Sequence, residues 1–228
     1  MIRDLSTDGV LCLQLHLGGD RNFHYLLGDP AAGRAAAVDP GFDPDHLAAI
    51  AAERGLVISH ILVTHDHVDH VGGAPRLAEL TGAPILAGRD DRLPGARVVD
   101  DGAVLEVGSV EMRALRTPGH APDHVCWQAG PFVCTGDLLF CGKVGGTDAK
   151  HFPGSSPRQQ WDSLVRVMQL PDATIVLPGH DYYGGQGTRP HSTIGLERET
   201  NPFLAGGYAD FLELKENWAA YKKEHGIR

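Results

Sequence analysis

The chain has 228 residues, of which 42% are hydrophobic and 21% charged, and its formal net charge is -9 at pH 7. A chain of this length can bury a full core, so we expect a single domain over residues 1–228, with residues from about 190 to 228 forming a short helical extension. The negative charge, without any lysine- or arginine-rich run, argues against nucleic acid as a partner.

The composition also bears on where the protein works. The apolar runs are too short to cross a membrane, and the N-terminal residues do not follow the pattern of a signal peptide. The four cysteines have no paired spacing, which favours reduced thiols over a disulfide framework. These features predict a cytoplasmic protein that does not engage membranes. They leave its oligomeric state open.

Period-two alternation dominates the beginning of the chain. Leucines at every second position of residues 11–17 predict a half-buried strand. Further strands are expected at residues 23–27, 35–38 and 58–63. Between the last two, an amphipathic helix should begin at Asp43 and end at Gly55.

Helices and strands continue to mix in the rest of the chain. This order favours a layered α/β sandwich with helices outside two sheets. The predicted elements are a helix at 74–81, a strand at 84–87, a series of strands over 98–135, a helix entered through Ser156-Pro157, a strand at 173–177 and a final helix at 207–224.

The densest set of chemically active residues follows the strand predicted at 58–63. Residues 64–70 read Thr-His-Asp-His-Val-Asp-His. His65 and His67 would project to one side of an extended segment, while Asp69 and His70 follow as the chain turns. A solvated polar turn seldom contains so many potential ligands, so this loop is predicted to serve two adjacent metal ions.

Three later segments share one form, in which a strand is followed by a turn with glycine and then a potential ligand. Together with the first cluster they supply seven oxygen or nitrogen ligands. A set of carboxylates and imidazoles without thiolate suits zinc, iron or manganese. The segments are Thr117-Pro118-Gly119-His120, Thr135-Gly136-Asp137 and Leu177-Pro178-Gly179-His180.

Residues 65–70 resemble the His-x-His-x-Asp-His signature of the metallo-β-lactamase superfamily, and the later ligands follow in that superfamily's order. The resemblance implies an α/β fold, the four-layered αββα metallo-β-lactamase sandwich. It also implies two metal sites that share a bridging carboxylate. The first site would consist of His65, His67 and His120, the second of Asp69, His70 and His180, and the bridge would be Asp137.

Within the superfamily, residues 22–27, 37–41, 141–143 and 179–182 are similar to hydroxyacylglutathione hydrolase (glyoxalase II). The resemblance implies a thioesterase that cleaves a small thiol-derived substrate, a glutathione-type thioester, by means of a metal-bound hydroxide. Two divalent ions are expected, with zinc preferred over iron or manganese. Catalytic roles would fall to Asp69 and Asp137, and glutathione contacts to Lys143 and Tyr182.

The resemblance is incomplete at the C-terminal end. Full-length glyoxalase II has a helical extension whose basic residues help to hold glutathione, and this chain has a much shorter segment after His180. Residues 192–197 and 201–204 instead resemble the endings of shorter glyoxalase-like proteins and of persulfide dioxygenases. The substrate therefore stays open.

Two other functions compete with thioester hydrolysis. In a persulfide dioxygenase, a single Fe(II) would be held by His65, His120 and Asp137, a two-histidine, one-carboxylate set that suits oxygen chemistry. A non-catalytic metal-binding module is disfavoured, because structural zinc sites normally close with four ligands. Asp66 has two readings as well, either orienting a histidine or capping backbone N–H groups of the turn.

Overall fold

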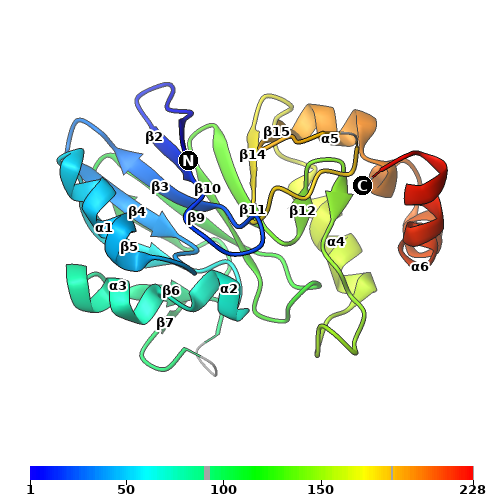
Figure 1. Ribbon diagram of the computed structural model, residues 1–228, viewed down its shortest axis with the longest axis horizontal. Helices are drawn as coiled ribbons and strands as arrows, with labels where there is room; N and C mark the ends of the chain where they lie inside the picture. The colour runs from blue at the N-terminus through cyan, green and yellow to red at the C-terminus, as the bar shows by residue number, and fades with distance from the viewer. Residues whose placement is uncertain (90–92, 186, 228) are drawn as a thin grey trace.

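The computed structural model describes residues 1–89, 93–185 and 187–227, and the strands in these residues form two large sheets (Figure 1). In the first sheet, seven strands follow one another in chain order. Its elements are β1 (Ile2–Asp4), β2 (Leu11–Leu15), β3 (His24–Asp29), β4 (Arg34–Val38), α1 (Pro44–Glu53), β5 (Val57–Leu62), α2 (Val68–Val71), α3 (Ala74–Thr81), β6 (Ile85–Ala87) and β7 (Arg97–Val98). The strands from β4 to β7 are parallel, and helices form the connections from β4 to β5 and from β5 to β6.

The second sheet has the order β15-β14-β11-β10-β9-β8, and a small hairpin of β12 and β13 lies beside it. Its neighbours are antiparallel except for the parallel pair β11 and β14. The elements are β8 (Val104–Val107), β9 (Val110–Arg116), β10 (Val125–Ala129), β11 (Phe132–Gly136), β12 (Leu139–Phe140), β13 (Lys143–Val144), α4 (Pro157–Val167), β14 (Ile175–Pro178), β15 (Ser192–Thr193), α5 (Ile194–Thr200), the 3-10 helix η1 (Pro202–Leu204) and α6 (Tyr208–Glu224).

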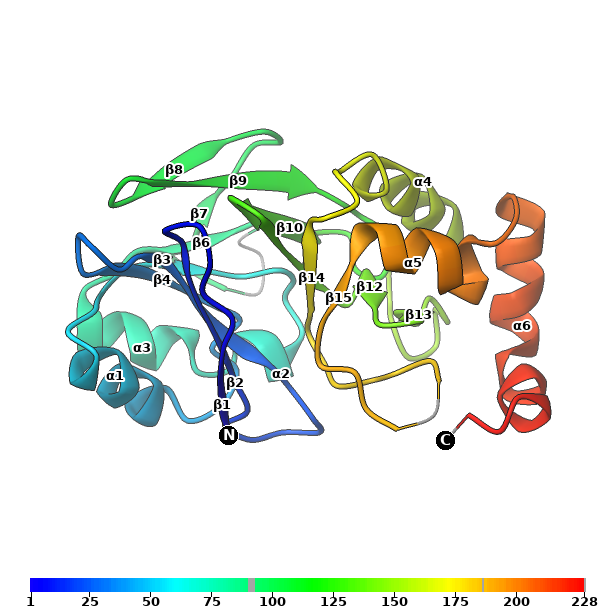
Figure 2. The same ribbon diagram turned by 90° about the horizontal axis from the view of Figure 1, so that it is seen from above.

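The layers follow from three separate hydrophobic clusters. One packs α1 and α3 on the first sheet, one fills the space between the sheets, and one packs α4, η1 and α6 on the second sheet. Figure 2 accordingly shows α1 and α3 on one side of the strands and α4, α5 and α6 on the other. The predicted αββα sandwich is confirmed.

Strand β2 departs from the expected half-buried pattern, because all five of its residues are buried. Leu11, Leu13 and Leu15 pack under the helices, whereas Cys12 faces the second sheet. Gln14 is only 1% exposed, and its amide donates to the Tyr25 hydroxyl at 3.1 Å and to the carbonyl of Pro190 at 2.6 Å. The alternation of residues along β2 therefore reflects two different buried environments on the two faces of the strand, and neither face is exposed to solvent.

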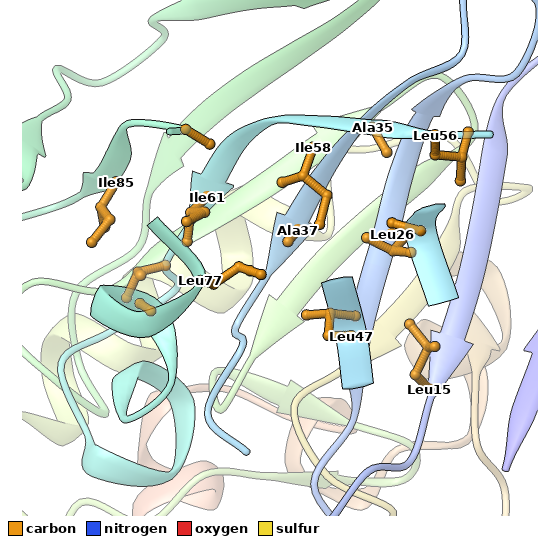
Figure 3. Close-up of a cluster of buried hydrophobic side chains, with 14 of the residues drawn as sticks. Leu15, Leu26, Ala35, Ala37, Leu47, Leu56, Ile58, Ile61, Leu77 and Ile85 are labelled. Carbon is orange, nitrogen blue, oxygen red and sulfur yellow. The ribbon is translucent and has the colours of Figure 1, made fainter. Parts of the chain in front are cut away.

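The outer cluster of the first sheet is drawn in Figure 3. The small side chains of Ala35 and Ala37 lie in this cluster, and Ala37 is the cross-strand partner of Leu26 on β3, so the helices can approach the sheet closely. Leu47 from α1 and Leu77 from α3 close this layer, and both are fully buried. Each buried leucine contributes about 1.5–3 kcal/mol through removal of apolar surface from water.

Several short elements were not anticipated. They are β1, the four-residue helix α2, the β12–β13 hairpin and strand β15, whereas helix α5 falls within the helical extension expected from about residue 190. The strand expected at 173–177 is β14, but β15 then adds a further strand at the sheet edge. The four cysteines are free and buried. None of the helices in the described ranges is long and apolar enough to cross a membrane.

Strand ends bring the potential ligands together. Strand β5 ends at Leu62, just before the histidine-rich loop. In the parallel pair of β11 and β14, Gly136 is the partner of Pro178, so Asp137 and His180 leave the sheet side by side. The amide of Val125 donates to the carbonyl of Thr64 at 2.7 Å and thereby joins the two sheets at this edge.

Candidate metal centre

The first group of ligands is a triad of imidazoles. Nε2 of His65 lies 2.9 Å from Nδ1 of His67, and Nε2 of His120 lies 3.2 Å from the same atom. Ligand atoms around a zinc ion at about 2.0–2.1 Å are separated by about 3.3 Å in a tetrahedron. The three nitrogens therefore have the spacing of one coordination sphere.

The second group combines one carboxylate with two imidazoles. Nε2 of His70 lies 3.3 Å from Nε2 of His180, and Oδ2 of Asp69 lies 3.3 Å from the latter. Within each triad the ligand atoms fall within 4.8 Å of one another. Asp69 and His70 reach this position because α2 begins at Val68 and turns both side chains inward.

Asp137 lies between the two triads. Its Oδ1 is 3.4 Å from Nε2 of His70, and its Oδ2 is 3.7 Å from Nε2 of His120 and 3.5 Å from Nε2 of His180. Oδ1 is buried without a hydrogen-bond partner. A buried, unsatisfied carboxylate oxygen that faces imidazoles from both triads suits a shared cation.

Three of the histidines that direct Nε2 into the centre bond through Nδ1 to an oxygen outside it. Nδ1 of His120 donates to the carbonyl of Gly146 at 2.7 Å, and Nδ1 of His180 donates to the carbonyl of Asp20 at 3.0 Å. Nδ1 of His70 donates to Asp39 at 2.8 Å. These contacts place the proton on Nδ1 and direct the Nε2 lone pair inward, as metal-ligating histidines require.

The ring of His65 is oriented in a similar way, by hydrogen bonds that run through Thr64 to Asp39. The hydroxyl of Thr64 donates to Oδ2 of Asp39 at 2.6 Å, so its oxygen accepts from Nδ1 of His65 at 3.0 Å. The backbone amide of Thr64 also donates to Asp39, at 2.7 Å. One carboxylate therefore supports a ligand in each triad. The donor set and its outer partners fit two divalent cations.

The electrostatics of the two triads differ. Burial lowers the pKa of His65 well below its usual value and that of His120 to about 4, so both stay neutral. Burial acts in the same direction on His180, but Asp137 and Asp69 outweigh it and raise the pKa to about 9. Burial also lowers the pKa of His70, but Asp137 and Asp39 outweigh this effect, and the pKa of His70 is raised well above its usual value. In the metal-free protein these carboxylates therefore favour the protonated imidazoles of the second triad, and a bound cation would take the place of those protons.

A glycine keeps the centre open on the side of β14. A Cβ on Gly179 would lie 2.5 Å from Oδ1 of Asp137 and 2.7 Å from Cε1 of His70. Any larger residue would therefore push into the space between the ligands. The Pro-Gly-His turn is thus a steric requirement of the site as well as a way to end the strand.

A cavity of about 570 Å³ adjoins the centre, and His120 and Asp137 form part of its wall. Lys143 and Tyr182 both line this cavity, so the structure places these two candidates beside the ligands. The Lys143 ammonium lies 5.0 Å from the centroid of the Tyr182 ring. That ring stacks on His180 at 4.5 Å, and its hydroxyl donates to Asp20 at 2.5 Å.

All seven potential ligands thus meet at one place, but several of their partners were missed from the sequence. Asp39 supports His70, and the amide of Asn22 donates to Oδ2 of Asp69 at 3.0 Å. Asn22 is also bridged to His180 through the backbone. These residues lie far from the motif in the chain, so its spacing carried no signal for them.

Comparison with known proteins agrees with this geometry. A family model described as the Metallo-beta-lactamase superfamily matches residues 25–180. A hydroxyacylglutathione hydrolase from Pseudomonas putida is 34% identical over 233 residues, which cover 88% of each chain. One from Rhodospirillum rubrum is 34% identical over 230 residues, with 84% of this chain and 86% of the relative covered.

Solved structures give the same result. ETHE1 from Myxococcus xanthus has a TM-score of 0.79 and 30% identity, with both chains covered completely. TTHA1623 in a di-iron-bound form has a TM-score of 0.70 and 33% identity over 84% of this chain and 99% of that one. The fold, the ligand constellation and these similarities lead to one conclusion: the chain belongs to the metallo-β-lactamase superfamily.

Proposed function

We propose that the protein is a two-metal thioester hydrolase that acts on a glutathione-type thioester. The observation that carries this proposal is the second triad. Asp69, His70 and His180 converge with their own outer partners, and a one-metal mechanism would leave this arrangement without a purpose. The hydroxyacylglutathione hydrolases among the relatives support the substrate class.

The position of each candidate ligand suggests its role in binding the cations. Asp69 would hold one cation, Asp137 would be shared by both, and the imidazoles would complete the two ligand sets. Two divalent ions bound there would lower the pKa of water towards neutrality and polarise the thioester carbonyl. A thiolate leaves without strong acid assistance, so the site needs no separate proton donor for it.

The cavity offers matching contacts for the glutathione portion. Phe140, Phe152 and Trp218 contribute apolar walls, and Lys143 contributes a cation. In the described part of the chain no carboxylate lies within ion-pair distance of Lys143, so a ligand carboxylate can become its partner. The phenol oxygen of Tyr182, which already donates to Asp20, can still accept a hydrogen bond.

The test is cleavage of S-lactoylglutathione by protein loaded with two equivalents of zinc. Release of free glutathione should be catalytic and should require both equivalents. Protein with full zinc loading that fails to cleave this thioester and other glutathione thioesters would refute the proposal.

A persulfide dioxygenase is the second candidate. His65, His120 and Asp137 lie in the same centre and could hold one iron ion. The similarity over the whole chain to ETHE1, a persulfide dioxygenase, supports this alternative, but no more strongly than the hydroxyacylglutathione hydrolases support hydrolysis. Both candidates use the same cavity, so they differ in metal requirement and in oxygen consumption.

A further inference from the structure

Lys215 projects from α6 towards the metal centre. This C-terminal helix lies at the edge of the molecule beside α4 and α5 (Figure 2). The ammonium of Lys215 donates to the carbonyl of Gly145 at 2.7 Å and to Oε1 of Gln160 at 2.7 Å. A half-buried cation therefore connects α6 to α4 and to the turn that follows β13.

That turn contacts a metal ligand directly. Gly145 and Gly146 follow β13, and the carbonyl of Gly146 accepts the Nδ1 proton of His120. A Cβ on Gly145 would overlap the carbonyl oxygen of Asp137 and lie 3.0 Å from Nδ1 of His120. The turn is thus packed against two ligands, and a shift of its backbone would rotate the His120 ring.

Gln160 of α4 completes the support. Its Nε2 donates to the carbonyl of Gly145 at 3.0 Å while its Oε1 accepts from Lys215. The side chain is fully buried, and a Cβ on Gly119 would overlap its backbone. Gln160 therefore contacts both the residue before His120 and the turn that holds the His120 ring.

Apolar packing alone does not account for a lysine at position 215. Burial lowers its pKa to about 7, with Lys143 adding repulsion, so the folded protein disfavours its charged form. In the described residues no carboxylate forms an ion pair with it. A methionine would fill similar space without that penalty. A cation that is held by two neutral oxygens and the Phe211 ring, and that binds a ligand-bearing turn, points to a role in the site.

We propose that Lys215 is a positioning residue that fixes the Gly145–Gly146 turn and thereby orients His120 for metal. The metal affinity of the first triad then depends on the docking of α6. The inference does not rest on the proposed reaction, because His120 is a ligand in both the hydrolase and the dioxygenase.

The test compares Lys215→Met with Lys223→Met, a control at an exposed position of the same helix. Zinc affinity is measured by competition with a chelator, in protein whose folding is verified by thermal denaturation. For Lys215→Met we expect zinc binding to be about tenfold weaker at the first triad and little changed at the second. In metal-free protein, the NMR signal of the His120 Nδ1 proton should exchange faster with solvent. The control should match the wild type in both measurements.

A second pair of variants separates positioning from packing. Lys215→Arg retains a charged donor and should restore most of the affinity. Lys215→Gln, which also serves if the methionine variant fails to fold, should give an intermediate value. If folded Lys215→Met or Lys215→Gln binds zinc as tightly as the wild type and the His120 proton exchanges at the same rate, the proposal is overturned. The same holds if the only change is a higher KM for a thioester.

Discussion

The carboxylate of Asp39 lies 2.8 Å from Nδ1 of His70 and is only 3% exposed. It also accepts hydrogen bonds from the amide and the hydroxyl of Thr64, the residue next to His65. Because this carboxylate lies behind ligands of both triads, it sets the orientation of the centre from outside it.

Replacing Asp39 by Asn should weaken metal binding without unfolding the protein. The amide keeps the size of the side chain but removes the negative charge that polarises His70. We expect a loss of zinc affinity of about 10-fold to 100-fold, mainly at the second triad. Competition with a chelator measures it. Asp43→Asn is the matched control, since Asp39 and Asp43 both adopt a positive φ, at 50° and 46°. Equal affinities in the two variants would contradict this role of Asp39.

Substitution of Lys143 by Ala should affect binding more than chemistry. A charge contact with a remote part of the substrate stabilises the ground state and the transition state alike. KM for a glutathione thioester should rise about tenfold, the value expected for one lost charge-assisted hydrogen bond, while kcat changes little. Lys150→Ala, at an exposed position, serves as the control. A normal KM in the Lys143 variant would remove this residue from the substrate site.

Asp123 should make the metal-free protein less stable as the pH rises. Burial, with a contribution from Asp66, raises the pKa of its carboxyl from 3.8 to about 7. The folded chain then holds the proton more tightly than the unfolded chain, so stability falls between about pH 4 and pH 7. Asp123→Asn removes this loss and should stabilise the protein at pH 8 by up to about 4 kcal/mol, with little effect at pH 4. Denaturant unfolding at both pH values measures the difference, and equal effects at the two would contradict the assignment.

The sequence was informative wherever a structure depends on neighbouring residues. Period-two leucines located β2, and the period of 3.6 located α1, α4 and α6. Helix α2 escaped notice because its four residues are set by tertiary packing. A Cβ on Gly41 would overlap the carbonyl oxygen of Asp69, so the distant Asp39-Pro40-Gly41 turn dictates the path of this helix.

The same distinction applies to the site. The candidate ligands follow strands in short motifs, and these motifs, together with the family resemblance, were enough to predict which side chains would come together. Their supports could not, because Asn22, Asp39 and Lys215 reach the centre from other parts of the chain. The packing of whole layers decides whether such residues come within hydrogen-bond distance of the centre. Local sequence does not encode that distance.

The most direct test of a two-metal hydrolase is the rate of S-lactoylglutathione cleavage with and without oxygen, in the wild type and in His180→Ala. Water is the only co-substrate of hydrolysis, so the wild-type rate should be the same under nitrogen and in air. The variant should lose activity together with its second metal ion, because His180 belongs to the triad that a single iron would not use. The account would be contradicted if fully loaded protein left the thioester intact and consumed oxygen with glutathione persulfide, with His180→Ala retaining that oxygen uptake.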